Sequence, residues 1–154
     1  MRQVERIAEL EDRLPSVLRG ERKPADAEET RSFADLCYRK KLYGASTRFW
    51  HAAFQAEPAL AENLQSADRY NAACSAALAG CGKGRDDPPL DEKERSQWRA
   101  QAVAWLKADL VVFREAIQTE TLDAPALVRQ KLAHGRQDPE ASGKNAMTPS
   151  EDVA

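Results

Sequence analysis

The sequence predicts an all-α fold built from antiparallel helix pairs. Its 154 residues include only 7 glycines and few aromatic or β-branched side chains, a composition that favours helices over strands. Apolar residues recur at spacings of three and four, and capping residues or prolines separate the periodic segments. The chain is long enough for one domain with a modest core.

The first periodic segment places Val4, Ile7, Leu10 and Leu14 on one helical face. We expect this helix to end near Pro15, because proline removes a backbone donor and clashes with the preceding turn. The glycine of "LRGE" suits the stop of the short turn that follows. Residues 1–24 are therefore predicted to be an N-terminal helix and its linker.

A second helix is predicted from about 27 to 41. Asp26 is placed as its N-cap, and Glu29 stands three residues later, as in a capping box. The residues expected to face inward are Phe33, Ala34, Cys37 and Tyr38.

A third helix lies in "YGASTRFWHAAFQAEP", after a break near Gly44, and Pro58 ends it. It carries two apolar strips, which predict a helix wedged between two partners. One strip is Tyr43, Ser46, Thr47, Trp50, Ala53 and Phe54, and the other is Phe49, Ala52 and Ala56.

The next helix, in "RYNAACSAALAG", has a predicted inner face of small residues: Ala72, Ala73, Ala76 and Ala77, with Tyr70 and Cys74 at its edges. "CGKGRDDPPL" then reads as a loop, because its two prolines exclude a helix.

A long helix should follow to about residue 118, with Asp91 as N-cap and Glu94 completing a capping box. Its two strips are Trp98, Ala102 and Trp105, and then Val103, Leu106, Leu110, Phe113 and Ile117. A last helix is expected from Asp123 to about His134, and the polar residues 136–154 are predicted to be disordered.

Composition disfavours several classes of function. The formal net charge of −2 argues against a nucleic-acid surface. No apolar run approaches the roughly 20 residues of a membrane span, and the charged N-terminus does not resemble a secretory signal. Three cysteines without a C-x-x-C pair fit reduced thiols. We therefore expect a cytoplasmic protein with no nucleic-acid or membrane partner.

No catalytic or metal-binding motif stands out. "GCGKG" lacks the glycine spacing and the serine or threonine of a phosphate loop, and a helix stop explains it better. The cysteines are widely spaced, and only His51 and His134 are available beside them, so buried small side chains are a better interpretation than a zinc site. We expect no enzyme activity and no cofactor.

Counting back from Pro58, the second and third helices resemble a tetratricopeptide (TPR) repeat, a helix–turn–helix unit of about 34 residues. The matching positions are Ala34, Cys37, Tyr43, Ser46, Trp50, Ala53 and Pro58. "RYNAACSAALAG" resembles the first helix of a second repeat. That repeat departs from the pattern through the "CGKGRDDPPL" insertion, through Asp109 where alanine is usual, and through the lack of a terminal proline. The resemblance implies a TPR-like α-solenoid of about two repeats, over residues 25–135, with flanking helices.

The order of "LPSVLRGERKPADAEE", "RYNAACSAALAG" and "WLKADL" also resembles the TPR-containing C-terminal regions of large bacterial serine/threonine protein kinases, over roughly residues 5–135. The chain has none of the kinase signature motifs. The resemblance therefore implies a detached tail module and not a kinase.

This family resemblance implies a non-catalytic protein–protein interaction module that binds a protein or peptide, with self-association as a further possibility. The register predicts that the groove residues are Arg31, Asp35, Tyr38, Arg39, Tyr70 and Asn71. A clamp for a C-terminal carboxylate is not expected, because Asp35 replaces the usual asparagine and would repel the ligand. For each groove residue the alternative is an ordinary solvated helix face. For the whole chain the alternative is a structural spacer or cap of a kinase-type protein, with no ligand of its own.

Overall fold

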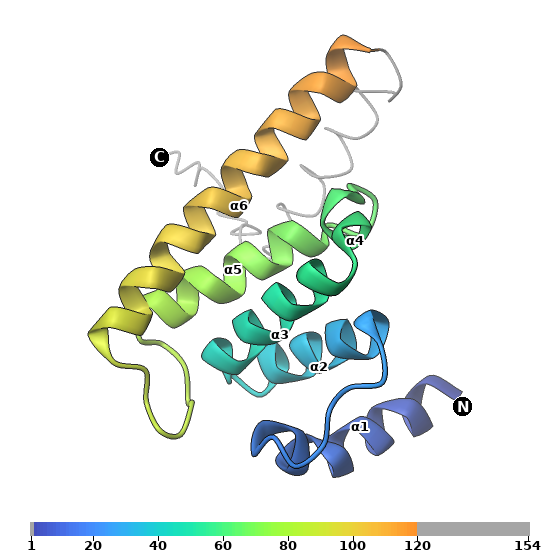
Figure 1. The fold of residues 1–154 in the computed structure, drawn as a ribbon, viewed down its shortest axis with the longest axis vertical. Coiled ribbons are helices and arrows are strands. Elements are labelled where there is room, and N and C mark those ends of the chain that lie inside the picture. Colours follow the sequence, from blue (N-terminus) through green and yellow to red (C-terminus); the bar gives the residue numbers. More distant parts are fainter. Residues whose placement is uncertain (1, 120–154) are drawn as a thin grey trace, which may run out of the picture. The chain divides into compact units, whose positions relative to one another are not determined.

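The structure, a computed structural model, describes residues 2–119. This part of the chain is all-helical and contains no strand, so the predicted fold class is confirmed at that level. Figure 1 shows its helices, which are α1 (Arg2–Leu18), α2 (Ala27–Arg39), α3 (Tyr43–Ala56), α4 (Pro58–Glu62), α5 (Asp68–Gly80) and α6 (Glu92–Gln118). The expected helix at 123–134 and the expected disordered tail lie outside the described residues.

Residues up to Glu115 form one compact unit, and a second unit begins at Ala116. The packing among the helices is that of the first unit. The domain limits at 24 and 135 stay a prediction.

Helix α1 does not end at Pro15, as the sequence predicts, but continues to Leu18. Pro15 removes one hydrogen bond near the end of the helix, whereas Leu14 and Val17 of the same turn are buried and hold it against the core. The stop comes at Gly20, whose φ of 75° is the left-handed conformation that glycine adopts without strain.

Helix α1 lies across α2, and its ion pairs reach both ends of that helix. Arg13 pairs with Glu29 in the first turn of α2, whereas Glu11, only two residues earlier, pairs with Lys40 just after its end. The crossing buries a cluster that joins α1, α2 and α3: Leu10, Leu14, Val17, Phe33, Leu36, Cys37 and Ala45.

The N-cap predicted for α2 is confirmed. Asp26 Oδ1 accepts a hydrogen bond of 2.7 Å from the Glu29 backbone N–H, while Glu29 Oε2 accepts one of 2.6 Å from the N–H of Ala25. Phe33, Ala34 and Cys37 are buried as expected. Tyr38 is not, since 40% of it is exposed. Leu36, which was not among the expected residues, is also buried, and the ring of Tyr38 contacts that of Tyr43.

Helices α2 and α3 form an antiparallel hairpin. The break lies at Lys41, with φ 62°, and not near Gly44, which is already inside α3. The register follows from contacts along the pair: Tyr38 with Tyr43, Ala34 with Ser46, and Phe33 with Phe49.

The first predicted strip of α3 is confirmed at Ser46, Thr47, Trp50, Ala53 and Phe54, which are buried, whereas Tyr43 is only half-buried. The second strip is only partly right. Phe49 packs between both core clusters, but Ala52 and Ala56 are exposed. Pro58 does more than end α3, because it occupies the first turn of the short helix α4, which sequence analysis did not predict.

Helix α5 packs antiparallel on α3 and buries Ala72, Ala73 and Ala76, as predicted. The prediction is wrong for Ala77, which is exposed, whereas Ser75 and Ala79 are buried. A buried hydrogen bond of 3.0 Å between the hydroxyls of Ser46 and Ser75 joins the helix to α3.

Helix α6 begins as predicted. Asp91 Oδ1 accepts from the Glu94 N–H at 2.8 Å, and Glu94 Oε2 accepts from the Asp91 N–H at 3.1 Å. In the first of its two predicted strips, Ala102 and Trp105 are buried and Trp98 packs against the same core. In the other strip Val103, Leu106, Leu110 and Ile117 are between 40% and 68% exposed, whereas Phe113 is half-buried.

Helices α5 and α6 run antiparallel. Arg69 near the start of α5 pairs with Asp109, and the end of α5 comes close to Arg99. A Cβ placed on Gly80 would lie 2.5 Å from Arg99 Cγ and 3.0 Å from two backbone atoms of α6, so this approach needs a glycine.

Candidate partner-binding face

All six predicted groove residues lie on α2 and α5, the two helices that flank α3. Because α2 and α5 are both antiparallel to α3, they run in the same direction, and their facing edges are joined by an ion pair between Arg31 and Asp68. We call Arg31, Asp35, Tyr38, Tyr70 and Asn71 the α2/α5 face. Arg39, the sixth residue, is the last residue of α2 and is exposed.

Arg31 holds the two helices together. Its Nε donates a 2.8 Å hydrogen bond to Asp68 Oδ2, and its Nη1 lies 3.2 Å from Glu28 Oε1. The hydrogen bond to Asp68 is the main cause that raises the pKa of Arg31. Asp68 is only 1% exposed, and its Oδ1 has no hydrogen-bond partner among the described residues. Arg31 is therefore largely committed to contacts within the chain.

Asp68 was not a predicted site residue. An aspartate in the first turn of a helix is expected to interact with the helix dipole, so its local sequence gives no sign of a long-range partner. Its pairing with Arg31 depends on how α5 lies against α3.

Asp35 is half-buried and has no hydrogen-bond or ion-pair partner within residues 2–119. Its burial raises the pKa of its carboxyl group, and the nearby carboxylates Asp68 and Glu28 act in the same direction. Arg31 and Arg39 oppose this shift but do not reverse it. The interactions of Asp35 with the two arginines thus do not fully replace the hydration that burial removes.

Tyr38 and Tyr70 are 40% and 49% exposed and both lie near the Cys74 thiol. Burial and then Cys74 raise the pKa of Tyr38, and Cys74 is the largest cause that raises the pKa of Tyr70, with which it forms a hydrogen bond. Burial also raises the pKa of Cys74, which keeps the thiol protonated at neutral pH. The face therefore presents two partly exposed aromatic rings near a thiol that is protonated at neutral pH.

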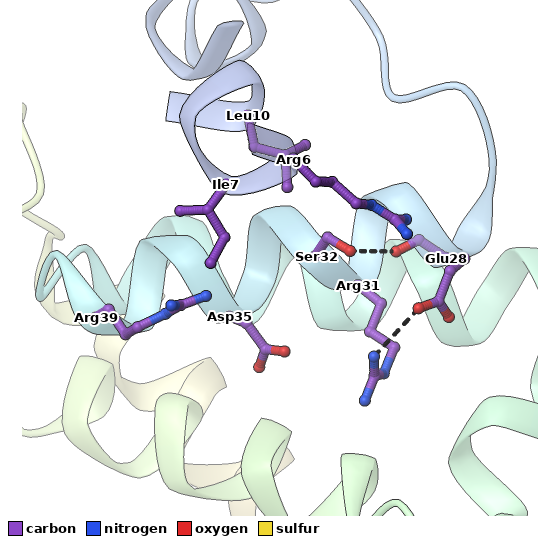
Figure 2. Close-up of a pocket in the computed structure, with 8 residues that line it drawn as sticks. All are labelled: Arg6, Ile7, Leu10, Glu28, Arg31, Ser32, Asp35 and Arg39. Carbon is purple, nitrogen blue, oxygen red and sulfur yellow. Dashed lines mark hydrogen bonds and ion pairs between the residues drawn. The ribbon is translucent and has the colours of Figure 1, made fainter. Parts of the chain in front are cut away.

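A cavity of about 440 Å³ opens between α1 and α2 beside this face. It is lined by Arg6, Ile7, Leu10, Glu28, Arg31, Ser32, Asp35 and Arg39, which Figure 2 shows. In that view Arg31 and Asp35 extend to the same side of α2, and Ile7 reaches toward the helix from α1. Three predicted residues, Arg31, Asp35 and Arg39, thus lie on one cavity. Arg6 and Ile7 were missed, because their place depends on the crossing of α1 over α2.

The side chains of this cavity carry both signs of charge, three arginines and two carboxylates. Its apolar side chains, Ile7 and Leu10, both come from α1. Such a lining suits a polar chain segment better than an apolar small molecule.

Within the described part of the chain, no group of three or more histidine, cysteine or acidic side chains is arranged to hold a metal ion. His51 packs its ring against Trp105, with 6.4 Å between ring centroids. Among residues 2–119, none of the helices combines the length and the apolar character that crossing a membrane requires.

Comparisons with protein-family models, with curated proteins and with solved structures return no match for this chain. The resemblance to TPR repeats and to kinase C-terminal regions therefore rests on the quoted residues alone, and it stays a prediction.

Proposed function

We propose that this chain is a non-catalytic protein–protein interaction module of TPR type, and that the α2/α5 face binds a segment of the partner. The observation that carries the proposal is the arrangement of α2 and α5. The repeat register assigns both segments to the first helix of a repeat, and the two helices run in the same direction along α3 with the predicted residues on their facing edges.

The packing of small residues also supports the TPR interpretation. Ala34, Ala53 and Ala73 are at most 1% exposed, and Trp50 fills the space beside them. These are the roles that the repeat pattern gives to its small and aromatic positions. The arrangement α2–α3 and then α5–α6 corresponds to two successive antiparallel pairs.

The α2/α5 face has the composition of a recognition surface. Tyr38 and Tyr70 offer large, partly exposed rings that lose little conformational freedom on binding. Asn71 is exposed beside them and has both donor and acceptor groups for a peptide backbone. Because two repeats make a short groove, we expect modest affinity unless the module acts within a larger assembly.

The test is capture of partners from the native cell with the full chain. The variant Tyr38→Ala/Tyr70→Ala removes both rings without touching the core, and Val4→Ala, at a residue that is 71% exposed on α1, is the matched control. We expect one or more proteins to be retained by the wild type and the control but lost with the double variant. Equal recovery of every protein by all three chains would contradict the proposal.

Self-association is a second candidate, favoured by the exposed strip of α6. Val103, Leu106 and Leu110 are spaced by three and four residues, as at the seam of a pair of helices, and are 40% to 68% exposed. Sedimentation of the wild type and of Leu106→Lys/Leu110→Lys across a range of concentrations tests this idea. A wild type that stays monomeric throughout would exclude it.

The kinase resemblance extends the main proposal. A module of this kind would act in the cytoplasm beside a serine/threonine kinase-type protein. If neither the α2/α5 face nor the α6 strip binds any protein, the structural spacer becomes the better hypothesis.

A further inference from the structure

We propose that the α6 strip, made of Val103, Leu106 and Leu110, binds an amphipathic helix of a partner protein whose apolar side is bordered by acidic residues. The strip lies on a different helix from the α2/α5 face, so it adds a second interaction surface to the proposed function. The occupant is a helix of another protein, and charge complementarity beside the strip is the argument for it.

The three residues of the strip are large and apolar, yet they are between 40% and 68% exposed. Their spacing of three and four residues places them on one line along the helix. The side of α6 that carries Ala102 and Trp105 is already packed in the core. The strip is therefore a second apolar line, and it is shaped to take one further helix.

Two basic side chains border the strip. Lys107 stands four residues after Val103 and three before Leu110. Arg114 stands four residues after Leu110. Residues at these spacings are neighbours on a helix surface, so both cations lie beside the strip. Both side chains are exposed and can reach the edge of a helix that lies on the strip.

The charges of Lys107 and Arg114 are not compensated by their neighbours on α6. No acidic residue of α6 stands three or four positions from either of them. Asp109 is held by Arg69, and Glu115 follows Arg114 directly, where adjacent residues of a helix do not face each other. Within residues 2–119 no ion pair joins Lys107 or Arg114 to an acidic side chain. The formal net charge of the chain is −2, so this basic edge is not part of a general positive excess.

A second copy of the chain matches this edge less well. With the strip at the seam of an antiparallel pair, Lys107 of one copy would face Arg114 of the other. In a parallel pair, Lys107 would face Ala102 and Arg114 would face Asp109, which Arg69 already neutralises. Neither arrangement supplies a free carboxylate. A membrane surface also fits less well, because a helix at that interface buries a broad apolar face and the strip is narrow.

A library of helical peptides displayed on phage, selected on the full chain, tests the inference. Each peptide has three heptads with leucine at the seam, and the positions that border the seam vary among glutamate, lysine and glutamine. We expect selection on the wild type to enrich glutamate at these positions. Selection on Lys107→Glu/Arg114→Glu should enrich lysine instead. Lys83→Glu/Arg85→Glu, which reverses two exposed charges of the 81–91 loop, is the matched control and should select the same peptides as the wild type.

One selected peptide then measures the coupling by fluorescence anisotropy. Lys107→Glu/Arg114→Glu should weaken its binding about tenfold, as expected when two exposed ion pairs become repulsive, and the difference should shrink at high salt. Leu106→Gln/Leu110→Gln should abolish binding, because it removes the apolar contact. Urea unfolding checks that both variants keep the fold.

Three outcomes would overturn the inference. The first is selection without an acidic preference, or a selected peptide that binds the charge-reversed variant as tightly as the wild type. The second is dimer formation by the wild type that Leu106→Gln/Leu110→Gln abolishes, which would assign the strip to a second copy. The third is binding to vesicles of phosphatidylcholine and phosphatidylserine that the same variant abolishes, which would assign the strip to a membrane surface. None of these outcomes bears on the α2/α5 face, which has its own test in Tyr38→Ala/Tyr70→Ala.

Discussion

Arg69 at the start of α5 and Asp109 in α6 form an ion pair, with Arg69 Nε 2.8 Å from Asp109 Oδ1. Their side chains are only 10% and 12% exposed, so each charge depends on the other. Asp109 stands where the predicted TPR resemblance would place alanine, and its pairing with Arg69 explains how an acidic side chain is accommodated there. Because Asp68, the preceding residue, pairs with Arg31, the start of α5 is joined to α2 on one side and to α6 on the other.

Replacement of Asp109 by alanine should lower the free energy of unfolding by about 3 kcal/mol, because it leaves the buried Arg69 without its counter-charge. Urea unfolding followed by circular dichroism measures this loss. The double variant Arg69→Met/Asp109→Leu should recover most of it, since two apolar side chains leave no buried charge.

Glu92→Ala is the control, because Glu92 pairs with Arg95 and Arg99 on an exposed part of α6. Exposed pairs contribute little, so the unfolding midpoint should hardly change. A loss with Asp109→Ala no greater than with Glu92→Ala would show that the buried pair does not hold α5 to α6.

Replacement of Asp86 by alanine should destabilise the start of α3. Leu42, the N-cap residue, has no side-chain hydrogen bond to offer, and Asp86 from the 81–91 loop accepts from the N–H groups of Gly44 and Ala45 at 3.0 and 2.9 Å. The expected loss is about 1 to 2 kcal/mol, that of a helix N-cap. Hydrogen exchange should accelerate at these two amides first, and Asp87→Ala, an exposed neighbour, should leave them protected.

Cys37 predicts a specific dependence of stability on alkaline pH. Burial raises the pKa of its thiol from 9.0 to about 12. The folded protein therefore keeps a proton that the unfolded chain releases above about pH 9, and the stability present below that pH is lost as pH rises toward 12. The slope should reach about 1.4 kcal/mol per pH unit.

The comparison of wild type and Cys37→Ala between pH 8 and 11 isolates this thiol from other groups that titrate there. The difference in unfolding free energy should shrink as pH rises. A difference that is independent of pH would show that the thiol is not protected. At pH 8 a thiol reagent should label the exposed Cys81 and not Cys37 in the folded protein.

Asp35→Asn should stabilise the unbound protein at neutral pH. The pKa of Asp35 is raised by burial, so the folded state binds its proton more tightly than the unfolded chain, and the ionised carboxylate opposes folding. The variant should melt at a slightly higher temperature than the wild type at pH 7, and this advantage should disappear near pH 3. A lower melting temperature at pH 7 would show that Asp35 stabilises the fold.

Local signals account for the features that the sequence predicted well. The N-caps at Asp26 and Asp91 depend on residues three positions apart, so their geometry is contained in the sequence itself. The limits of α6 and the buried strip of α3 follow from long, regular apolar spacing.

Tertiary contacts account for the features that it missed. Pro15 is retained inside α1 because its neighbours are buried against α2 and α3. Tyr38 stays partly exposed at the edge of α2, where its neighbours are Tyr43 and Cys74. The pairing of Arg31 with Asp68, and the position of Arg6 at the cavity, join residues that no spacing rule relates. Of the candidate site, the residue set on α2 and α5 was accessible from the repeat register, whereas the contribution of α1 was not.

The cap that Asp86 gives to α3 has a consequence for chain synthesis. Residues 43–45 leave the ribosome about 40 residues before Asp86, whose carboxylate accepts hydrogen bonds from the amides of Gly44 and Ala45. Until that segment emerges, two amide groups at the head of α3 must be satisfied by water, and a chain cut after residue 80 would keep them in that state permanently. The first helix pair is thus not a self-sufficient building block that could be shortened or duplicated without the loop that carries Asp86.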